Sequence, residues 1–344
     1  MDGMATQKWR RLGSLIVILI WTSTPAPARS QERFQFAEPH LGTIVEITLY
    51  ASEETVANDA AKAAFARIKE LDQIFSDYKS DSETMRLCET AGSGQAVKVS
   101  PELFYVIRRS LEISEKSNGA FDVTVGPLVQ IWRRARKQKI LPTDDEIKIA
   151  KASVGWKLVK IDEATQSVEL KQTGMRLDFG GIAKGFIAQN VSQFLREKGH
   201  RQTLVVVAGD IVAGDAPPNT AGWKVGVAPL DRPNGAVSRL LLLKNIAIST
   251  SGDAFQFAEI KGVRYSHIVD PQTGIGLTQR SSVTVVAEDG TTADALATAI
   301  CVLGPEQGLK LIEGRDRIEA LIVLATDDGP RVVESKSFRS YERN

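Results

Sequence analysis

Hydrophobic residues recur at helical spacing in several stretches of the chain. Residues 54–75 carry an apolar face formed by Val56, Ala60, Ala64, Ile68, Leu71 and Phe75, which predicts an amphipathic helix. Residues 100–119 begin with Ser100 and Pro101 and end at a glycine, which are typical helix start and stop signals. Thr143 and Glu146 form a capping box for a short third helix. Further helices are predicted over 185–198, from about 292 to 303, and near 305–313.

Other stretches follow the pattern of β-strands. Residues 40–50 alternate, and residues 156–162 and 167–171 are predicted to form a hairpin. "MRLDF" (175–179) reads as a strand, and "TLVVVAGD" (203–210) as a strand buried on both faces. More strands are expected at 223–228, 238–244, 254–260, 263–269, 281–287, 319–326 and 330–335, with Lys261-Gly262 as a hairpin turn. Strands and helices mix irregularly, so we predict an α+β (mixed α/β) protein with two interleaved lobes and mixed sheets.

The N-terminus has the features of a secretory signal. Lys8, Arg10 and Arg11 precede a short apolar stretch, and small residues at Ala26 and Ala28 form an A-x-A cleavage pattern. Residues 1–28 are therefore predicted to be a signal peptide, and 29–344 the mature domain, which is soluble in the periplasm or another extracytoplasmic compartment. An uncleaved amphipathic anchor is the alternative, and the arginine pair leaves open Sec or twin-arginine export.

Composition and charge narrow the range of possible functions. A net charge of +1 gives no general electrostatic case for nucleic acid. The two cysteines, Cys88 and Cys301, allow at most one disulfide, and no cysteine follows the signal as a lipid attachment site.

Four sequence stretches contain candidate chemistry. In "LDFGGIAKGFIAQN" an acid, Asp178, precedes two glycines and Lys184 at a helix start. The stretch is neither a G-x-G-x-x-G fingerprint nor a P-loop, but bare backbone, a helix N-terminus and a lysine favour phosphate. A chance lysine in an ordinary turn is the alternative.

The second stretch is "TTADALATAICVLG". Asp294 and Thr298 are four residues apart and share one helix face, so they offer two hard oxygen ligands. With a glycine carbonyl from the Gly180-Gly181 turn they could hold Mg²⁺. Alternatively, Asp294 stabilises the helix N-terminus and Thr298 is an interior threonine.

His267 is the third candidate, because it is the one histidine of three that lies in an apolar strand pattern, before the turn "DPQTG". It is a candidate base or a structural residue. In "GAFDVTVGPL", Asp122 could accept hydrogen bonds from a ligand or from its own turn.

Together these stretches resemble a known family. "GAFDVTVGPL", "DFGGIAKG", "HIVDPQTG" and "ADALATAICVLG" occur in the order found in the ApbE-type FAD:protein FMN transferases, and "FSDYKSDSETMRL" and "AISTSGD" also match. The resemblance covers about residues 34–335. It implies a ligand cleft between lobes, FAD as substrate, Mg²⁺, and transfer of FMN onto a Thr or Ser hydroxyl of an exported redox protein as a phosphoester, with release of AMP.

The resemblance also implies residue roles. Asp294, Thr298 and the Gly181 carbonyl would hold the metal, and His267 would be the catalytic base. FAD would be contacted by Leu41, Tyr78, Ala120, Phe121, Asp122, Asp178, Lys184 and Val269. The Tyr78 ring would stack on the isoalloxazine.

The chain departs from the family pattern at four positions. Leu41 stands where the family commonly has Met, and Val123 stands where it has Pro. Ala208 replaces a Gly of the family pattern and could restrict a backbone turn. Ala297 stands where some members have a second Asp, which favours a single Mg²⁺. Two other functions remain open at this point: an Mg²⁺-dependent FAD pyrophosphatase that gives FMN and AMP, and a periplasmic flavin-binding module without transfer activity.

Overall fold

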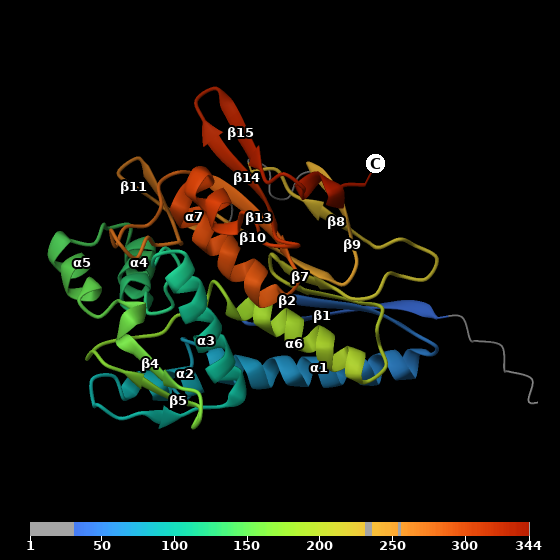
Figure 1. Cartoon of the computed structure of the whole chain (residues 1–344), viewed down its shortest axis with the longest axis horizontal. Coiled ribbons are helices and arrows are strands. Elements are labelled where there is room, and N and C mark those ends of the chain that lie inside the picture. Colours follow the sequence, from blue (N-terminus) through green and yellow to red (C-terminus); the bar gives the residue numbers. More distant parts are fainter. Residues whose placement is uncertain (1–30, 231–235, 254–255, 344) are drawn as a thin grey trace, which may run out of the picture. The chain divides into compact units, whose positions relative to one another are not determined.

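An eight-stranded antiparallel sheet runs through the computed structural model (Figure 1), which describes residues 31–230, 236–253 and 256–343. Its strand order is β1-β2-β6-β7-β10-β13-β14-β15. The predicted signal peptide lies outside the described residues. Among these residues Cys88 and Cys301 are both buried free thiols.

The large sheet consists of β1 (Glu32–His40), β2 (Thr43–Ala51), β6 (Thr203–Val207), β7 (Asp210–Ala213), β10 (Ile246–Gly252), β13 (Ser281–Ala287), β14 (Glu319–Thr326) and β15 (Gly329–Glu334). Smaller sheets are formed by β3 (Val97–Lys98), β4 (Val159–Asp162) and β5 (Ser167–Leu170), by β8 (Trp223–Val227) and β9 (Arg239–Leu243), and by β11 (Phe257–Ile260) and β12 (Val263–Ser266). The helices are α1 (Glu54–Phe75), α2 (Glu83–Glu89), α3 (Pro101–Lys116), α4 (Gly126–Gln138), α5 (Asp144–Lys151), α6 (Ala183–Glu197) and α7 (Gly290–Ile312), with 3-10 turns at Trp156–Leu158 and Phe338–Tyr341.

The two faces of the large sheet are covered by different elements. Helices α1, α6 and α7 pack on one face (Figure 1), while the β8–β9 hairpin belongs to a second core cluster. Strand β10 shows the period of two: Ala247 joins the helical core, and its neighbours Ile246 and Ile248 join the cluster of the hairpin. Burial on alternating faces therefore fixes the register of the central strands.

Several sequence predictions are confirmed. Helix α1 spans residues 54–75 as predicted, and the Thr143–Glu146 capping box is formed. Gly304 has non-helical dihedral angles that break α7 where two helices were expected. The mixture of helices and antiparallel sheets confirms the α+β class.

Three expectations differ from the structure. "MRLDF" is not a strand, because only Arg176 makes an isolated bridge, with Val125. All named strand pairs are antiparallel, since tight turns such as 41–42 and 208–209 join neighbouring strands, so the sheets are not mixed. Strand β6 alternates between buried and half-buried positions and is not buried on both faces.

Helix α7 is the helix of the described residues whose length and apolar composition would allow it to cross a membrane. Its first half, Gly290 to Cys301, is largely buried and packs on β10 and β13. The described residues from Gln31 onward cluster into one compact unit, and α7 is a core helix of that unit.

Ala208, in the turn between β6 and β7, has a φ of 55°. The left-handed region costs a non-glycine residue roughly 1–2 kcal/mol. Ala208→Gly is therefore expected to raise the free energy of unfolding by up to about 1 kcal/mol, after glycine's larger chain entropy is subtracted. Urea denaturation measures this change. Ala213→Gly is the matched control: Ala213 is buried in β7, and its replacement should lower stability. Equal losses in both variants would contradict the strain at 208.

Candidate functional site

The start of α7 touches the start of α6 through two glycines. A Cβ placed on Gly185 would lie 2.0 Å from the carbonyl oxygen of Gly290, a distance that no side chain tolerates. This contact brings Asp294, which is 1% exposed, to the N-terminus of α6, where its Oδ2 accepts a hydrogen bond from the Gly185 N–H at 3.0 Å. A carboxylate at this position is stabilised by the helix dipole and by the free N–H groups.

Lys184 lies between two buried carboxylates. Its Nζ donates to the Gly180 carbonyl at 2.6 Å and lies 3.5 Å from Asp210 Oδ2 and 3.6 Å from Asp294 Oδ2. Burial disfavours the charged lysine, but the carboxylates of Asp294 and Asp210 outweigh it and raise the pKa of Lys184. Burial, with repulsion from Asp210, raises the pKa of Asp294 against the attraction of Lys184. When both acids are ionised, two carboxylates and one ammonium leave a net negative charge in a buried place, which favours a further cation.

Thr298 lies one helical turn after Asp294 and faces the glycine pair. A Cβ on Gly181 would meet the Thr298 Oγ1 at 2.7 Å, so only a glycine lets the backbone come this close. The carboxylate of Asp294, the hydroxyl of Thr298 and the adjacent Gly181 backbone are hard oxygen donors, which suits Mg²⁺. In the described part of the chain, no three His, Cys, Asp or Glu side chains group as metal ligands, so a cation here would need the neutral oxygens.

His267 is held in the form that a base requires. It follows β12 directly, and its Nδ1 lies 3.1 Å from the Gln256 carbonyl. Because a carbonyl only accepts, Nδ1 carries the proton and Nε2 keeps its lone pair. Burial, together with the positive charges of Lys184 and Arg136, lowers the pKa of His267 to about 4. The imidazole is therefore neutral at pH 7.

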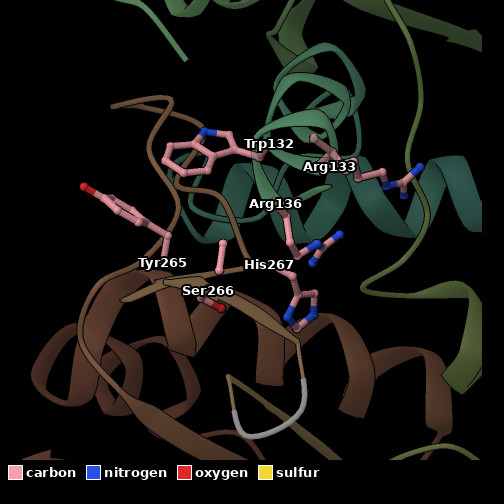
Figure 2. A pocket seen from close by; sticks show the side chains of 8 residues that line it. Trp132, Arg133, Arg136, Tyr265, Ser266 and His267 are labelled. Carbon is pink, nitrogen blue, oxygen red and sulfur yellow. The ribbon is translucent and has the colours of Figure 1, made fainter. Parts of the chain in front are cut away.

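His267 opens into a small pocket (Figure 2). The pocket has a cavity volume of about 10 Å³, and its wall is formed by Val129, Trp132, Arg133, Arg136, Ala258, Tyr265, Ser266 and His267. Trp132 donates from Nε1 to the Gly274 carbonyl at 2.8 Å, and its ring centroid lies 5.1 Å from that of Tyr265. The wall opposite His267 is thus a fixed face of α4.

A chain of contacts connects an exposed ring to the buried carboxylates. Tyr78 is 79% exposed, and the Arg133 guanidinium lies 4.4 Å from its ring centroid. Arg133 also pairs with Asp77 and, at 2.9 Å, with Asp178. Asp178 accepts from the Gly180 N–H at 2.8 Å, and the Gly180 carbonyl binds Lys184. The site therefore extends from an open aromatic face to a cation-attracting corner.

Comparison with known proteins places this chain in a family. The model described as the ApbE family matches residues 41–322. The chain belongs to the ApbE family. It is 29% identical over 334 residues to the FAD:protein FMN transferase of Vibrio cholerae, which covers 96% of this chain and 98% of that protein. It is 31% identical over 328 residues to the enzyme of the same name from Treponema pallidum, with 91% and 90% covered.

Solved structures agree with this assignment. The flavin transferase ApbE from Vibrio cholerae has a TM-score of 0.81 at 29% sequence identity, and the match covers 91% of this chain and 100% of that one. At this identity and coverage, the ApbE fold extends over nearly all of the described residues.

Other expected residues of this ApbE protein are packed into its interior. Ala120, Phe121 and Asp122 are all buried. The Oδ1 of Asp122 accepts from the N–H and hydroxyl of Thr124, and its Oδ2 accepts from the Trp156 N–H. Burial raises the pKa of Asp122 against these hydrogen bonds. Asp122 therefore accepts hydrogen bonds from its own turn and from the Trp156 N–H, and its contact with a ligand stays a prediction.

Leu41 lies at the edge of the main core, and Val269 belongs to a smaller core cluster. Leu41 lies in the β1–β2 turn with a φ of 55° and packs against the main core. Val269 is buried and bridges to Gly276. The geometry leaves their contact with a ligand as a prediction.

Three residues of the site were missed from the sequence. Asp210 ends the run "VVVAGD", and that position after a strand and a turn was an available signal. Arg133 and Arg136 lie in "RRARKQK", a charge run that is usually a solvated face. Their spacing from Val129 and Trp132 places all four residues on one face of α4, but nothing in the sequence showed that His267 faces it.

The depressed pKa of His267 predicts a pH dependence of stability. Its folded pKa of about 4 lies below the ordinary value of 6.5, so the unfolded state takes up the proton first. The stabilisation is complete above pH 6.5 and is lost as pH falls towards 4. Because the ring is partly exposed, we expect neutral His267 to contribute about 1–2 kcal/mol to the free energy of unfolding.

Urea denaturation between pH 7 and pH 4 checks this. The parent should lose more stability than His267→Gln over this range. His200→Gln, a change outside the pocket, should follow the parent. If His267→Gln and the parent lose stability in parallel, the imidazole is not held neutral by the fold.

Proposed function

We propose that this chain is an Mg²⁺-dependent FAD:protein FMN transferase. It moves FMN from FAD onto a Thr or Ser hydroxyl of an exported redox protein as a phosphoester and releases AMP. The observation that carries the proposal is the run of contacts from Tyr78 through Arg133, Asp178 and Lys184 to Asp294. A substrate with a flat ring at one end and a diphosphate further along matches that order of groups. The names of the ApbE relatives support the same activity.

The oxygen donors fit a hard divalent cation. Asp294, Thr298 and the Gly181 carbonyl would hold one Mg²⁺, and Ala297 offers no second carboxylate. When bound, Mg²⁺ would neutralise charge on the diphosphate.

Lys184 supplies the permanent positive charge of the site. Its ammonium is fixed by the Gly180 carbonyl and the two acids, so it is already oriented when a diphosphate arrives. Preorganised charge of this kind stabilises a phosphoryl-transfer transition state without a reorganisation cost. Asp178 would act through Arg133, which it orients beside Tyr78.

Tyr78 and the loop residues would receive the flavin. The exposed ring of Tyr78 offers a large flat face to the isoalloxazine. Ala120, Phe121 and Asp122 would form the rigid floor of the flavin site, with Leu41 and Val269 at its edge.

His267 would take the proton of the acceptor hydroxyl on Nε2. The hydroxyl oxygen forms a bond to the phosphorus of the FMN half as the bond between that phosphorus and the bridging oxygen breaks. The bridging oxygen and its electron pair leave with AMP. A base in this position contributes typically 10²–10⁴-fold to the rate.

The predicted secretory leader supports an extracytoplasmic acceptor. Residues 1–28 as a signal peptide and 29–344 as the transferase domain would place the enzyme in the periplasm, with exported redox subunits as partners.

Protease protection of the full-length chain in intact cells tests this location. We expect the protease to cleave the protein only after the outer envelope is opened. A cytosolic pool that keeps residues 1–28 would overturn the proposed location.

Asp294→Asn is expected to remove metal-dependent activity. The amide keeps the shape of the side chain but loses its charge, so Mg²⁺ affinity should fall at least about 100-fold. AMP release from FAD at increasing Mg²⁺ concentration measures this. Asp289→Asn is the matched control, because Asp289 caps the same helix and Asn caps equally well. A normal Mg²⁺ dependence in Asp294→Asn would remove Asp294 from the metal site.

His267→Gln should leave FAD binding within about twofold and slow flavin transfer by 10²–10⁴-fold. A candidate acceptor with an exposed Thr is co-expressed, and in-gel flavin fluorescence and intact mass report the label. Transfer at the normal rate would show that His267 is not the base.

One further measurement separates the alternatives. AMP release is followed in FAD and Mg²⁺ with no acceptor present. Release as fast as with acceptor identifies a pyrophosphatase, and tight FAD binding with no release or labelling identifies a flavin-binding module.

A further inference from the structure

Arg136 has no carboxylate partner among the residues that the structure describes. It is half-buried and lines the pocket of His267. Within residues 31–230, 236–253 and 256–343, no ion pair or side-chain hydrogen bond is formed by Arg136, whereas Arg133 and Arg134 on the same helix pair with acids. Because no acid among the described residues neutralises it, the positive charge of Arg136 can attract an anion that enters the pocket from outside the chain.

The direction of the side chain supports a role in the pocket. Val129, Trp132, Arg133 and Arg136 follow the i, i+3, i+4, i+7 pattern on one face of α4. Figure 2 shows the Arg136 side chain directed towards the imidazole of His267. Its neighbour Lys137 is exposed.

The charges around the pocket leave Arg136 uncompensated. Arg133 is neutralised by Asp77 and Asp178. Asp253 also acts electrostatically on His267, but it is paired with Arg264 at 2.6 Å. The remaining wall residues are neutral or apolar. The pocket therefore carries a net positive charge beside the atom that takes the acceptor proton.

We infer that Arg136 binds the diphosphate of the flavin nucleotide beside His267, as a second cation in addition to Lys184. The inference rests on the proposed function: the phosphorus under attack must lie within reach of the acceptor oxygen, whose proton goes to Nε2 of His267. A group in the same small pocket lies beside that phosphorus. The planar fork of arginine suits two phosphate oxygens. A bound oxyanion would also oppose the effect by which Arg136 lowers the pKa of His267.

Binding of four probes tests this role in the full chain: FAD, ADP, inorganic pyrophosphate and riboflavin, each with and without Mg²⁺. Arg136→Gln should lower the affinity for FAD, ADP and pyrophosphate about 10–100-fold, the range of one charged hydrogen-bond pair. Riboflavin, which has no phosphate, should bind to this variant with the same affinity as to the parent. Arg136→Lys should recover part of the loss. Lys137→Gln removes the same charge from the same helix outside the pocket and should change the affinities less than about threefold.

The outcomes separate the two proposals. Pyrophosphate affinity that is unchanged in Arg136→Gln, or absent in the parent, overturns the role of Arg136. So does equal weakening of riboflavin and pyrophosphate, which would indicate a structural effect. A higher KM for the acceptor protein alone would assign Arg136 to an acceptor carboxylate and would also overturn it. A parent that binds pyrophosphate through Arg136 but labels no acceptor retains this inference and overturns the proposed transfer.

Discussion

The close passage of two glycine backbones is the constraint on which the site depends. Gly185 and Gly290 touch at a distance that excludes any side chain, and this contact places the first turns of α6 and α7 together. Asp294 is buried as a result, and Lys184 is positioned between it and Asp210. A single ammonium cannot balance both acids when they are ionised, so the fold creates a demand for positive charge. That demand is the physical basis for a cation site with few charged ligands.

The rest of the site is assembled from segments far apart in sequence. The loop after α1 supplies Tyr78, α4 supplies two arginines, the turn before α6 supplies the bare backbone, and the end of β12 supplies His267. Antiparallel pairing of the large sheet fixes α6 and α7, while α4 is held against β11–β12 by the Trp132–Tyr265 contact. Charges alternate along the resulting strip. Each cation except Arg136 is held by an acid, and this one exception lies beside the base.

Local signals explain what could be predicted from the sequence. Helix α1, the Thr143–Glu146 capping box and the break at Gly304 depend on neighbours within a few residues, and each was predicted correctly. Asp294 and Thr298 share a helix face by spacing alone. Asp210 and Arg136 were missed because their roles come from contacts across the fold, which no local pattern contains. The apolar residues of "MRLDF" predict a strand, but the segment makes only one isolated bridge, between Arg176 and Val125, and has no ladder partner.

The geometry of His267 bears on why transfer would prevail over hydrolysis. The imidazole is partly exposed, and the pocket beside it has a volume of about 10 Å³, which is room for about one water molecule. Water is therefore not excluded from Nε2 in the free protein. Exclusion of water cannot be the reason why transfer would be faster than hydrolysis. Under the proposed function, an acceptor hydroxyl must react faster than water because it is better oriented. A well-placed group can act at an effective concentration of roughly 10⁵ M or more. Selectivity for a protein acceptor then depends on the surface around the pocket, where α4 and the segment after β12 meet.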